Sequence, residues 1–321
     1  MSIPVYEEEA IRRAVSLPQA IEAMESAFAV YSRKEATVPP VMHLDIPKYR
    51  GEVHMKCGYI HDSAHYVLKV AAGFYDNKQL NLPVSSGMMI LFDARTGFPV
   101  AFLVDGCYLT ELRTAAAGAV AAKYLARKSI EQVGILGAGS QGRFQLQALA
   151  CVRQFHRVRV YDHRATNVQR YLSDMKGTAG AELTAANTVE EAVRGSQVLI
   201  TATTSRQPLV RAEWVEPGTH ITAMGSDDPT KQELEADVLA RADVLVADSI
   251  SQCLRLGEIH HAVETSAIKE EDIDGELGDV ILGRIPGRTE DRQVTVCDLT
   301  GVGVQDAAIA ALAYQSLRSR N

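Results

Sequence analysis

Features that would mark a membrane protein, a secreted scaffold or a nucleic-acid binder are missing from this sequence. No segment reaches the roughly 20 consecutive apolar residues that cross a bilayer, and the first residues lack the basic stretch and apolar core of a signal peptide. Acidic and basic side chains are interspersed and the net charge is −7, so no basic stripe favours a nucleic acid or an anionic membrane. We therefore expect a cytoplasmic protein that binds neither nucleic acid nor membrane.

Cysteine is also scarce. The five cysteines are scattered, their number is odd, and no pair has the spacing of a zinc site or a redox couple. We expect reduced, mostly buried thiols and no bound metal. The chain is long, however: 321 residues, 46% of them hydrophobic, suffice for one large domain or for two ordinary domains with cores of their own.

The first third has the pattern of a mostly antiparallel α+β unit. Residues 1–35 read as helical, with a helix cap at residues 16–18 and apolar residues at helical spacing after it. Beyond a Pro39-Pro40 break the pattern changes to strands, which we expect at residues 41–46, 52–60, 66–74, 87–92 and 99–105. Residues 93–97 have the composition of a hairpin loop between the last two strands.

The rest of the chain alternates between strands and helices. A helix of small residues is expected at 110–127, and strands at 132–136, 157–161, 182–185, 198–203, 220–224 and 244–248, with a last one at 294–299. Helical segments between several of these strands predict a doubly wound, mainly parallel sheet. An alanine-rich helix at 306–318 is expected to return to the first unit.

The most specific motif is the glycine turn Gly137-Ala-Gly-Ser-Gln-Gly142, which follows an apolar run and opens a helix. Gly137 permits the tight turn, Gly139 lets a pyrophosphate approach the backbone, and Gly142 lets the helix pack on the strand. Asp162 ends the next apolar run, twenty residues after the last glycine, where it can accept hydrogen bonds from a ribose. This order predicts an α/β fold of the Rossmann type that binds a nicotinamide or flavin dinucleotide, with an ordinary strand–helix turn as the alternative.

The type of cofactor follows from the acidic residue. A carboxylate at Asp162 repels a 2′-phosphate and so favours NAD over NADP. His163 and Arg164 follow directly and would soften that preference, unless they belong to a solvated loop. Among the nicotinamide cofactors, NAD is therefore the expected one.

Three charged residues of the first unit are candidates for binding a substrate. Lys69 lies in the apolar strand Tyr66-Val-Leu-Lys-Val70, where a lysine is costly unless it faces a polar cleft. Lys56 poses the same question in the preceding strand, and an edge-strand position is the alternative for both. Arg113 begins the small-residue helix, where its guanidinium suits bidentate binding of a carboxylate, with a surface position as the alternative.

Candidates for proton transfer lie in the second half. Asp227 and Asp228 occur in Gly225-Ser-Asp-Asp-Pro229, directly after an expected strand, and ligands bind outside the carboxyl ends of such strands. Either carboxylate would serve as a proton donor or acceptor, or alternatively as the cap of a following helix. Asp306 is open to the same choice between a functional and a structural role. The His260-His261 pair is interpreted as part of an ordinary polar helix.

Taken together, these motifs resemble the ornithine cyclodeaminase/μ-crystallin family, which includes alanine dehydrogenases and imine reductases. The resemblance covers nearly the whole chain. Its most specific pieces are His43-Leu-Asp-Ile-Pro47, Leu112-Arg-Thr-Ala-Ala116, Val133-Gly-Ile-Leu-Gly-Ala-Gly139, Thr201-Ala-Thr-Thr-Ser205 and Gly225-Ser-Asp-Asp-Pro229 with Glu233-Leu234. It implies a homodimer with a Rossmann-type NAD-binding domain at 114–303 and an α+β substrate-binding and dimerisation domain at 1–113 with 304–321.

Residue by residue, the resemblance implies that Lys69 and Asp227 are the catalytic pair and that Arg113 positions the ligand. The residues that it places at the cofactor are Ser86, Arg113, Thr114, Gly137, Ala138, Gly139, Ser140, Gln141, Asp162, Thr203 and Ser205. The first five of the glycine turn form the phosphate loop, and Asp162 is the ribose acid.

Two departures from the family pattern lie near the expected substrate pocket. Many members carry an arginine just before the His-Leu-Asp segment, where this chain has Pro40-Val41-Met42, and Met-Pro-Ala-Tyr in the next strand, where it has Met55-Lys-Cys-Gly-Tyr59. In this respect the chain resembles the subgroup of iminosuccinate reductases and ectoine-utilisation proteins. For a dicarboxylate, Lys56 would then bind one carboxylate and Arg113 the other.

The leading hypothesis is an NADH-dependent imine reductase, or amino-acid dehydrogenase, whose substrate is a small 2-imino acid, with the conversion of iminosuccinate to L-aspartate as the specific choice. One alternative is an NAD-dependent cyclodeaminase, a lyase that releases ammonia from ornithine or diaminobutyrate. Another is a non-catalytic protein of the μ-crystallin type that binds NAD(P)H and a small ligand. The presence of both Lys69 and Asp227 favours catalysis.

Overall fold

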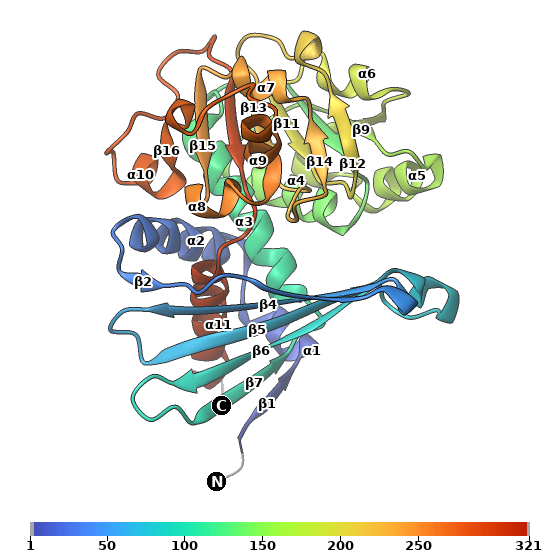
Figure 1. The fold of residues 1–321 in the computed structure, drawn as a ribbon. Coiled ribbons are helices and arrows are strands. Elements are labelled where there is room, and N and C mark those ends of the chain that lie inside the picture. The colour runs from blue at the N-terminus through green and yellow to red at the C-terminus, as the bar shows by residue number, and fades with distance from the viewer. Residues whose placement is uncertain (1–2, 320–321) are drawn as a thin grey trace. The chain divides into compact units, whose positions relative to one another are not determined.

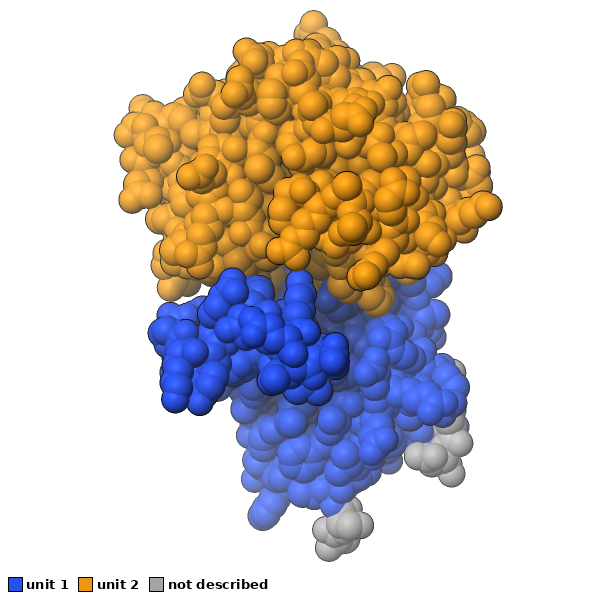
Figure 2. Space-filling model, turned by 90° about the vertical axis from the view of Figure 1, so that its right-hand side faces the viewer, with its two compact units in different colours: residues 1–113, 302–321 blue, residues 114–301 orange. Residues whose placement is uncertain are grey.

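The chain divides into two compact units, which Figure 2 shows in two colours. The computed structural model describes residues 3–319, and unit 1 holds residues 1–113 and 302–321 while unit 2 holds residues 114–301. The change from unit 1 to unit 2 falls inside helix α3 (Tyr108–Leu125). No helix in the described part of the chain is long and apolar enough to cross a membrane.

Unit 1 is built on a mainly antiparallel sheet (Figure 1). Across the sheet its strands are β1 (Val5–Glu7), β7 (Pro99–Val104), β6 (Ser85–Asp93), β5 (His65–Phe74), β4 (Gly51–Ile60) and β2 (Ala36–Thr37), and β3 (Met42–Ile46) also pairs with β4. The predicted hairpin loop is confirmed, because the Asp93 Oδ1 atom accepts hydrogen bonds from the backbone N–H groups of Arg95 and Thr96 at 3.1 and 2.7 Å.

The prediction that residues 1–35 are helical throughout is wrong near its start. Residues Val5–Glu7 form β1, which pairs in parallel with β7. A segment this short carries no periodicity, and its conformation is decided by the sheet edge that it meets. The helices follow as α1 (Glu8–Ala14) and α2 (Leu17–Ser32). The predicted cap of α2 is confirmed, since the Gln19 side chain accepts a hydrogen bond from the backbone N–H of Ser16 at 3.0 Å.

Helix α11 (Gly303–Arg318) packs on β4 and on α2 in unit 1. The approach is close: a Cβ atom on Gly58 would lie 2.3 Å from the carbonyl oxygen of Gly303, and one on Gly303 would lie 2.3 Å from that of Cys57. Glycine at both positions therefore lets the first turn of α11 lie directly on the strand. This packing brings Asp306, in the same turn, to the sheet.

Unit 2 is a doubly wound parallel sheet, as the sequence predicts. Its strand order is β10 (Glu182–Ala185), β9 (Arg157–Tyr161), β8 (Gln132–Leu136), β11 (Val198–Thr201), β13 (His220–Ala223), β17 (Thr295–Asp298), β15 (Val244–Ala247) and β16 (Gly275–Glu276). Its further helices are α4 (Ser140–Val152), α5 (Ala165–Asp174), α6 (Val189–Val193), α7 (Ala236–Ala240), α8 (Ile250–Cys253), α9 (Gly257–Glu264) and α10 (Leu277–Ile281). The strand near 294–299 lies inside the sheet, between β13 and β15.

Both faces of this sheet are covered by apolar side chains. On β11, Val198 and Ile200 belong to one buried cluster and Leu199 to another. Because successive strand residues point to opposite faces, the two clusters cover opposite sides. Burial on both faces explains why the strands read as continuous apolar runs. Not predicted from the sequence is a separate parallel pair, β12 (Arg206–Val210) with β14 (Gln232–Leu234).

Candidate active site

The glycine turn in unit 2 combines two glycines that packing requires with one that it does not. A Cβ atom on Gly137, whose φ is +103°, would lie 2.4 Å from the carbonyl oxygen of Ala202, and one on Gly142 would lie 2.1 Å from that of Gly137. By contrast, the Cβ position of Gly139 has no atom within 4 Å from any other described part of the chain, its two neighbours in sequence aside. Open space over Gly139, at the N-terminus of α4, is what a phosphate binding to the backbone needs.

Asp162, at the end of β9, is tied to the glycine turn. Its side chain is only 11% exposed, and its Oδ2 atom accepts a hydrogen bond from the backbone N–H of Ala138 at 3.1 Å. The Oδ1 atom accepts bonds from the Arg164 N–H at 2.9 Å and the Asn167 side-chain amide at 3.0 Å. The carboxylate therefore has a fixed orientation beside the glycine turn, which is compatible with its predicted role as the ribose acid.

Two further residues predicted at the cofactor, Thr114 and Gln141, are connected through a side chain of α4. The Gln145 side-chain amide donates hydrogen bonds to the carbonyl oxygen of Thr114 at 3.0 Å and to the Gln141 Oε1 atom at 3.2 Å. Ser140, the first residue of α4, is exposed. Thr114, Ser140 and Gln141 thus lie around the amino-terminal end of α4, next to the glycine turn.

A buried carboxylate that sequence reasoning missed joins the loops after β11 and β13. Glu233 is fully buried, and its side chain accepts hydrogen bonds from the backbone N–H groups of Thr203 at 2.6 Å and Gly225 at 2.9 Å. Burial raises the pKa of Glu233, and these hydrogen bonds oppose that rise. The Ser205 N–H in turn donates to the Thr203 Oγ1 atom at 3.1 Å, so Thr203 and Ser205 form one rigid turn. The only signal in the sequence was the acidic residue in the Glu233-Leu234 motif.

Asp227 lies in the loop after β13 with its side chain 45% exposed, and the Lys231 ammonium contacts its Oδ1 atom at 2.6 Å. The idea that Asp227 or Asp228 caps a following helix is wrong. The segment that follows continues into strand β14, and Asp228 instead accepts hydrogen bonds from the backbone N–H groups of Thr230 and Lys231 at 2.6 and 3.0 Å. Asp228 therefore shapes the turn, and Asp227 keeps an exposed carboxylate.

In unit 1 the predicted substrate residues meet in one buried cluster. Lys56 on β4 and Lys69 on β5 are direct cross-strand neighbours, and Arg113 comes from α3. Asp306 on α11 joins them: its Oδ1 atom lies 3.3 Å from the Lys69 Nζ atom and 3.2 Å from the Arg113 Nε atom. The four residues are between 1% and 8% exposed. The surface alternatives for Lys56, Lys69 and Arg113 are therefore wrong.

Burial and the neighbouring charges perturb this cluster in opposite ways. Burial lowers the pKa of Lys69 to about 7; Asp306 opposes that shift, whereas Arg113 and Lys56 add to it. For Asp306, burial alone would raise the pKa, but Lys69 and Arg113 outweigh it and hold the pKa below its usual value. Asp306 is therefore an ionised carboxylate, and the ammonium of Lys69 gives up its proton more readily than that of an ordinary lysine.

Ser86, predicted at the cofactor, lies in unit 1 on β6. It is exposed and pairs across the strands with Ala72 on β5. The predicted residues are thus divided between the two units. Lys56, Lys69, Ser86 and Arg113 belong to unit 1, and the remaining predicted residues, from Thr114 to Asp227, belong to unit 2.

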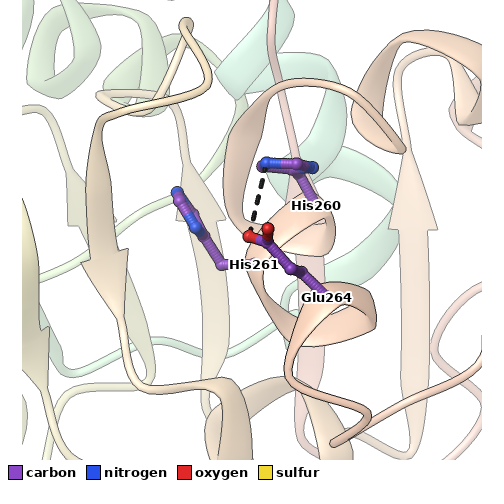
Figure 3. A group of neighbouring side chains, drawn as sticks. All are labelled: His260, His261 and Glu264. Atoms are coloured by element: carbon purple, nitrogen blue, oxygen red, sulfur yellow. Dashed lines mark ion pairs between the residues drawn. The ribbon is translucent and has the colours of Figure 1, made fainter.

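His260 and His261, for which the sequence predicted no role, form a group with Glu264 on α9 (Figure 3). Their potential ligand atoms lie within 4.8 Å of one another. Both imidazoles have backbone partners: His261 Nε2 lies 2.8 Å from the carbonyl oxygen of Lys231, and His260 Nδ1 lies 3.3 Å from that of Leu254. The contact of His261 supports the chain next to Asp227.

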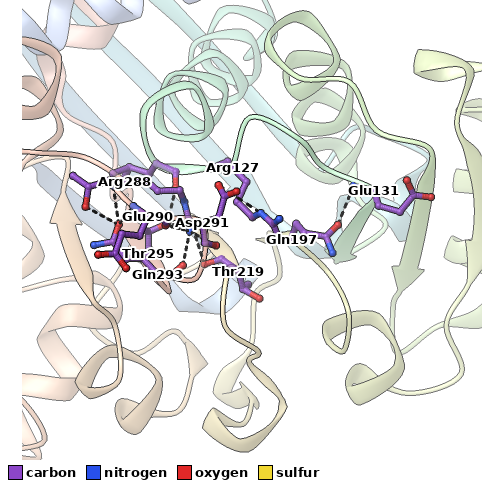
Figure 4. Close-up of polar contacts among 12 residues, drawn as sticks. Arg127, Glu131, Gln197, Thr219, Arg288, Glu290, Asp291, Gln293 and Thr295 are labelled. Carbon is purple, nitrogen blue, oxygen red and sulfur yellow. Dashed lines mark hydrogen bonds and ion pairs between the residues drawn. The ribbon is translucent and has the colours of Figure 1, made fainter.

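The opposite end of the unit 2 sheet is held by arginine (Figure 4). The Arg288 guanidinium donates hydrogen bonds to the carbonyl oxygens of Leu125 at 2.7 Å and Thr219 at 3.2 Å, and to the Thr295 Oγ1 atom at 3.1 Å. These bonds join the end of α3 to the amino ends of β13 and β17. The glycine turn, Thr203 and Asp227 all follow the carboxyl ends of strands, the edge at which doubly wound sheets bind ligands.

The doubly wound sheet and the glycine turn together define a dinucleotide-binding α/β protein. Comparison with known proteins identifies its family. The model of the ornithine cyclodeaminase/mu-crystallin family matches residues 4–321, so the chain belongs to this family. Among its relatives are a putative dehydrogenase of Rhizobium meliloti, 42% identical over 92% of this chain and 90% of the relative, and the alanine dehydrogenase of Archaeoglobus fulgidus, 38% identical over 100% of this chain and 97% of the relative. The iminosuccinate reductase of Paracoccus denitrificans is 37% identical over 95% of this chain and 94% of the relative.

Solved structures show the same fold. An archaeal alanine dehydrogenase dimer with bound NAD has a TM-score of 0.93 and 37% identity, covering 100% of this chain and 98% of the other. The iminosuccinate reductase of Paracoccus denitrificans in complex with NAD+ has a TM-score of 0.90 and 34% identity, covering 99% and 97%. The predicted family and fold class are therefore confirmed.

Proposed function

We propose that this protein is an NADH-dependent imine reductase that converts a small 2-imino acid into an amino acid, with iminosuccinate to L-aspartate as its reaction. It is an NAD-dependent oxidoreductase acting on C=N and CH–NH2 groups, in keeping with the names of its relatives. The observation that carries the choice of substrate is the buried cluster of Lys56, Lys69 and Arg113. Three basic side chains against the single carboxylate of Asp306 leave an excess of positive charge, which suits a substrate with more than one carboxylate.

The residues of unit 2 fit a nicotinamide dinucleotide. The open space over Gly139 and the N–H groups at the start of α4 suit its pyrophosphate, and the oriented carboxylate of Asp162 suits a ribose and disfavours a 2′-phosphate. When bound, NADH supplies a hydride. Related structures contain NAD or NADH, which supports the same cofactor here.

The residues of unit 1 bind and polarise the substrate in this scheme. Arg113 and Lys56 each hold one carboxylate, and Lys69 donates a hydrogen bond that orients the substrate next to them. Because the pKa of Lys69 is about 7, the lysine is partly protonated at neutral pH and an anionic substrate draws it toward the charged form. Asp306 keeps Lys69 and Arg113 in place when no substrate is present.

Asp227 exchanges the proton in this scheme. Reduction of an imine adds a hydride to carbon, and the nitrogen must carry a proton to accept the electron pair of the C=N bond. An exposed carboxylate such as Asp227 stabilises the protonated nitrogen and passes to water a proton that it takes up from the substrate. In the reverse direction the same carboxylate takes a proton from the substrate ammonium.

The substrate is tested by following NADH oxidation with iminosuccinate generated in situ. We expect turnover that exceeds turnover of pyruvate plus ammonia at equal concentrations. Turnover of pyruvate plus ammonia without turnover of iminosuccinate would rule out the dicarboxylate. Release of ammonia from ornithine or diaminobutyrate without net change in NADH would replace the reductase by a cyclodeaminase.

The role of Lys56 has a separate test. Lys56→Ala should raise KM for the dicarboxylate by about 10- to 100-fold, the value of one charged hydrogen bond, and change KM for a monocarboxylate by less than about threefold. Lys78→Ala, which alters an exposed lysine of the same unit, is the control and should leave both unchanged. Equal effects on the two substrates would remove Lys56 from the carboxylate site.

We also propose that the protein forms a homodimer through unit 1. The strands of this unit carry large apolar side chains that are exposed, namely Val5, Met42, Leu44, Met88 and Val104, at 37% to 62%. Apolar side chains gathered on a sheet favour a protein partner, and the related archaeal alanine dehydrogenase is a dimer. Light scattering on Leu44→Glu and the unaltered protein tests this, because a dimer that uses this sheet should dissociate in the variant.

A further inference from the structure

The loop after β13 contains a lysine whose position suggests a role in the reaction. The Lys231 side chain is only 9% exposed, and its Nζ atom lies 2.6 Å from the Asp227 Oδ1 atom and 3.4 Å from the Asp228 Oδ2 atom. A buried ammonium is costly unless it is paired and hydrogen-bonded. The contacts with Asp227 and Asp228 meet this need, and because the ammonium is buried they are screened less than the exposed ion pairs elsewhere on this protein.

The backbone at Lys231 is fixed from several directions. Its N–H donates to the Asp228 Oδ1 atom at 3.0 Å, and its carbonyl oxygen accepts a hydrogen bond from the Ser226 hydroxyl. His261 on α9 lies 2.8 Å from the same carbonyl oxygen through its Nε2 atom. The backbone of Lys231 is thus held by a neighbouring helix as well as by its own loop.

Because of this framework, one partner of the ion pair is held in place and the other adjusts to it. Lys231 is buried and its backbone is fixed, whereas the Asp227 side chain is 45% exposed. The ammonium therefore decides where the carboxylate lies, and not the reverse. The start of the loop is fixed too, because Glu233 binds the N–H groups of both Gly225 and Thr203.

We propose that Lys231 is a positioning residue that holds Asp227 as an oriented, ionised carboxylate for the proton exchange; this inference rests on the proposed function. An ionised Asp227 keeps the imine nitrogen protonated, so that the carbon accepts the hydride and the nitrogen takes the electron pair of the C=N bond. In the oxidative direction Asp227 removes one proton from the substrate ammonium before the hydride leaves. Lys231 touches neither substrate nor cofactor in this scheme and acts only through Asp227.

A double-mutant cycle tests the inference. Lys231→Met, Asp227→Asn and the double variant are compared by kcat, KM and NADH affinity. We expect Lys231→Met to lower kcat by about 10- to 100-fold while KM and NADH affinity change by less than about threefold. In the Asp227→Asn background the same substitution should lower kcat by less than about twofold, because the residue it acts through is already gone. Equal losses of kcat in both backgrounds would overturn the inference and leave Lys231 a structural role.

A matched control and a second variant complete the design. Lys269→Met removes a lysine of the same unit that pairs with Glu271 but is 77% exposed, and it should leave kcat unchanged. If Lys231→Met does not yield folded protein, Lys231→Gln replaces it in the cycle, since glutamine keeps a hydrogen-bond donor without the charge. Full kcat in Lys231→Gln would overturn the inference, because the charge would then be dispensable.

The outcomes separate this inference from the proposed function. A parent protein that reduces no imine and oxidises no amino acid would overturn the proposed function and the role of Lys231 together. Turnover by the parent with additive losses in the cycle would overturn only the role of Lys231. Turnover with non-additive losses supports both.

Discussion

Replacing Asp306 by asparagine tests the electrostatics of the buried cluster in unit 1. At 3.3 Å from the Lys69 Nζ atom, the carboxylate attracts the ammonium by about 5 kcal/mol at an effective dielectric constant of about 20. Relaxation and the neighbouring cations reduce this figure, and a single opposite charge usually moves a pKa by about 1 to 3. Asparagine has nearly the same shape and removes the charge.

The sign of the effect follows from the pKa of Lys69, which burial has already lowered to about 7. Asp306 favours the protonated lysine, so its loss lowers that pKa further. If protonated Lys69 orients the substrate, activity should be lost at a lower pH in Asp306→Asn. We expect the alkaline limit of the kcat/KM profile to move down by about 1 to 3 pH units.

The assay is a kcat/KM profile between pH 5 and pH 10 with NADH saturating. Breaking a buried ion pair costs about 3 to 5 kcal/mol of folding free energy, so urea unfolding must first show that the variant is folded at the assay temperature. Asp76→Asn, which removes the exposed partner of Arg50 in the same unit, is the control and should keep the parent profile. An alkaline limit unchanged in Asp306→Asn would refute the reasoning about Lys69.

Two remaining predictions concern unit 2. Gly139→Ala should keep the parent's melting temperature but weaken NADH binding at least about 10-fold, since its Cβ atom meets open space where a phosphate would bind. Gly142→Ala should lower both the melting temperature and the affinity for NADH, because its Cβ atom would lie 2.1 Å from the carbonyl oxygen of Gly137. Fluorescence titration measures the affinity of each variant and calorimetry its melting temperature. Equal melting temperatures of the two variants would contradict the packing argument. Burial lowers the pKa of His220 from 6.5 to about 3, so the folded state keeps this ring neutral, and its contribution to stability is present above pH 6.5 and lost as the pH falls toward 3. Urea unfolding of His220→Gln should therefore show a smaller loss of stability between pH 7 and pH 4 than the parent, and an identical pH dependence would exclude His220 as a cause.

Much of the fold could be predicted from the sequence because its signals are local. Strands β8, β9 and β10 begin and end at the predicted residues, since an apolar run between a turn and a helix leaves little freedom. Strand β1 was missed because its three residues acquire their conformation from β7. The position of β17 inside the sheet was missed for a similar reason: strand order depends on long-range packing.

In the candidate site, too, features with a local sequence signal could be predicted, and features that depend on long-range contacts could not. A lysine in an apolar strand was a local anomaly that singled out Lys69, and the structure places its side chain in a buried cluster with Arg113 and Asp306. Its partner Asp306 had no such signal, because the contact joins residues far apart in the sequence. Lys231 and Asp227 are close in sequence, but only the turn built by Asp228 brings their side chains together. The catalytic roles assigned to Lys69 and Asp227 stay predictions.

The packing of α11 on β4 has a consequence for how the protein is made. The strands of unit 1 leave the ribosome early, but the helix that covers them, and that carries Asp306, follows only after all of unit 2 has been synthesised. Unit 2 is continuous in sequence and can fold while synthesis proceeds. Folding of unit 1 cannot be completed until α11 has been synthesised, and until then Lys56 and Lys69 lie on a sheet that α11 does not cover. The buried cluster around Asp306 is therefore completed only after α11 has been synthesised, and a chain interrupted before α11 would carry the glycine turn without this cluster.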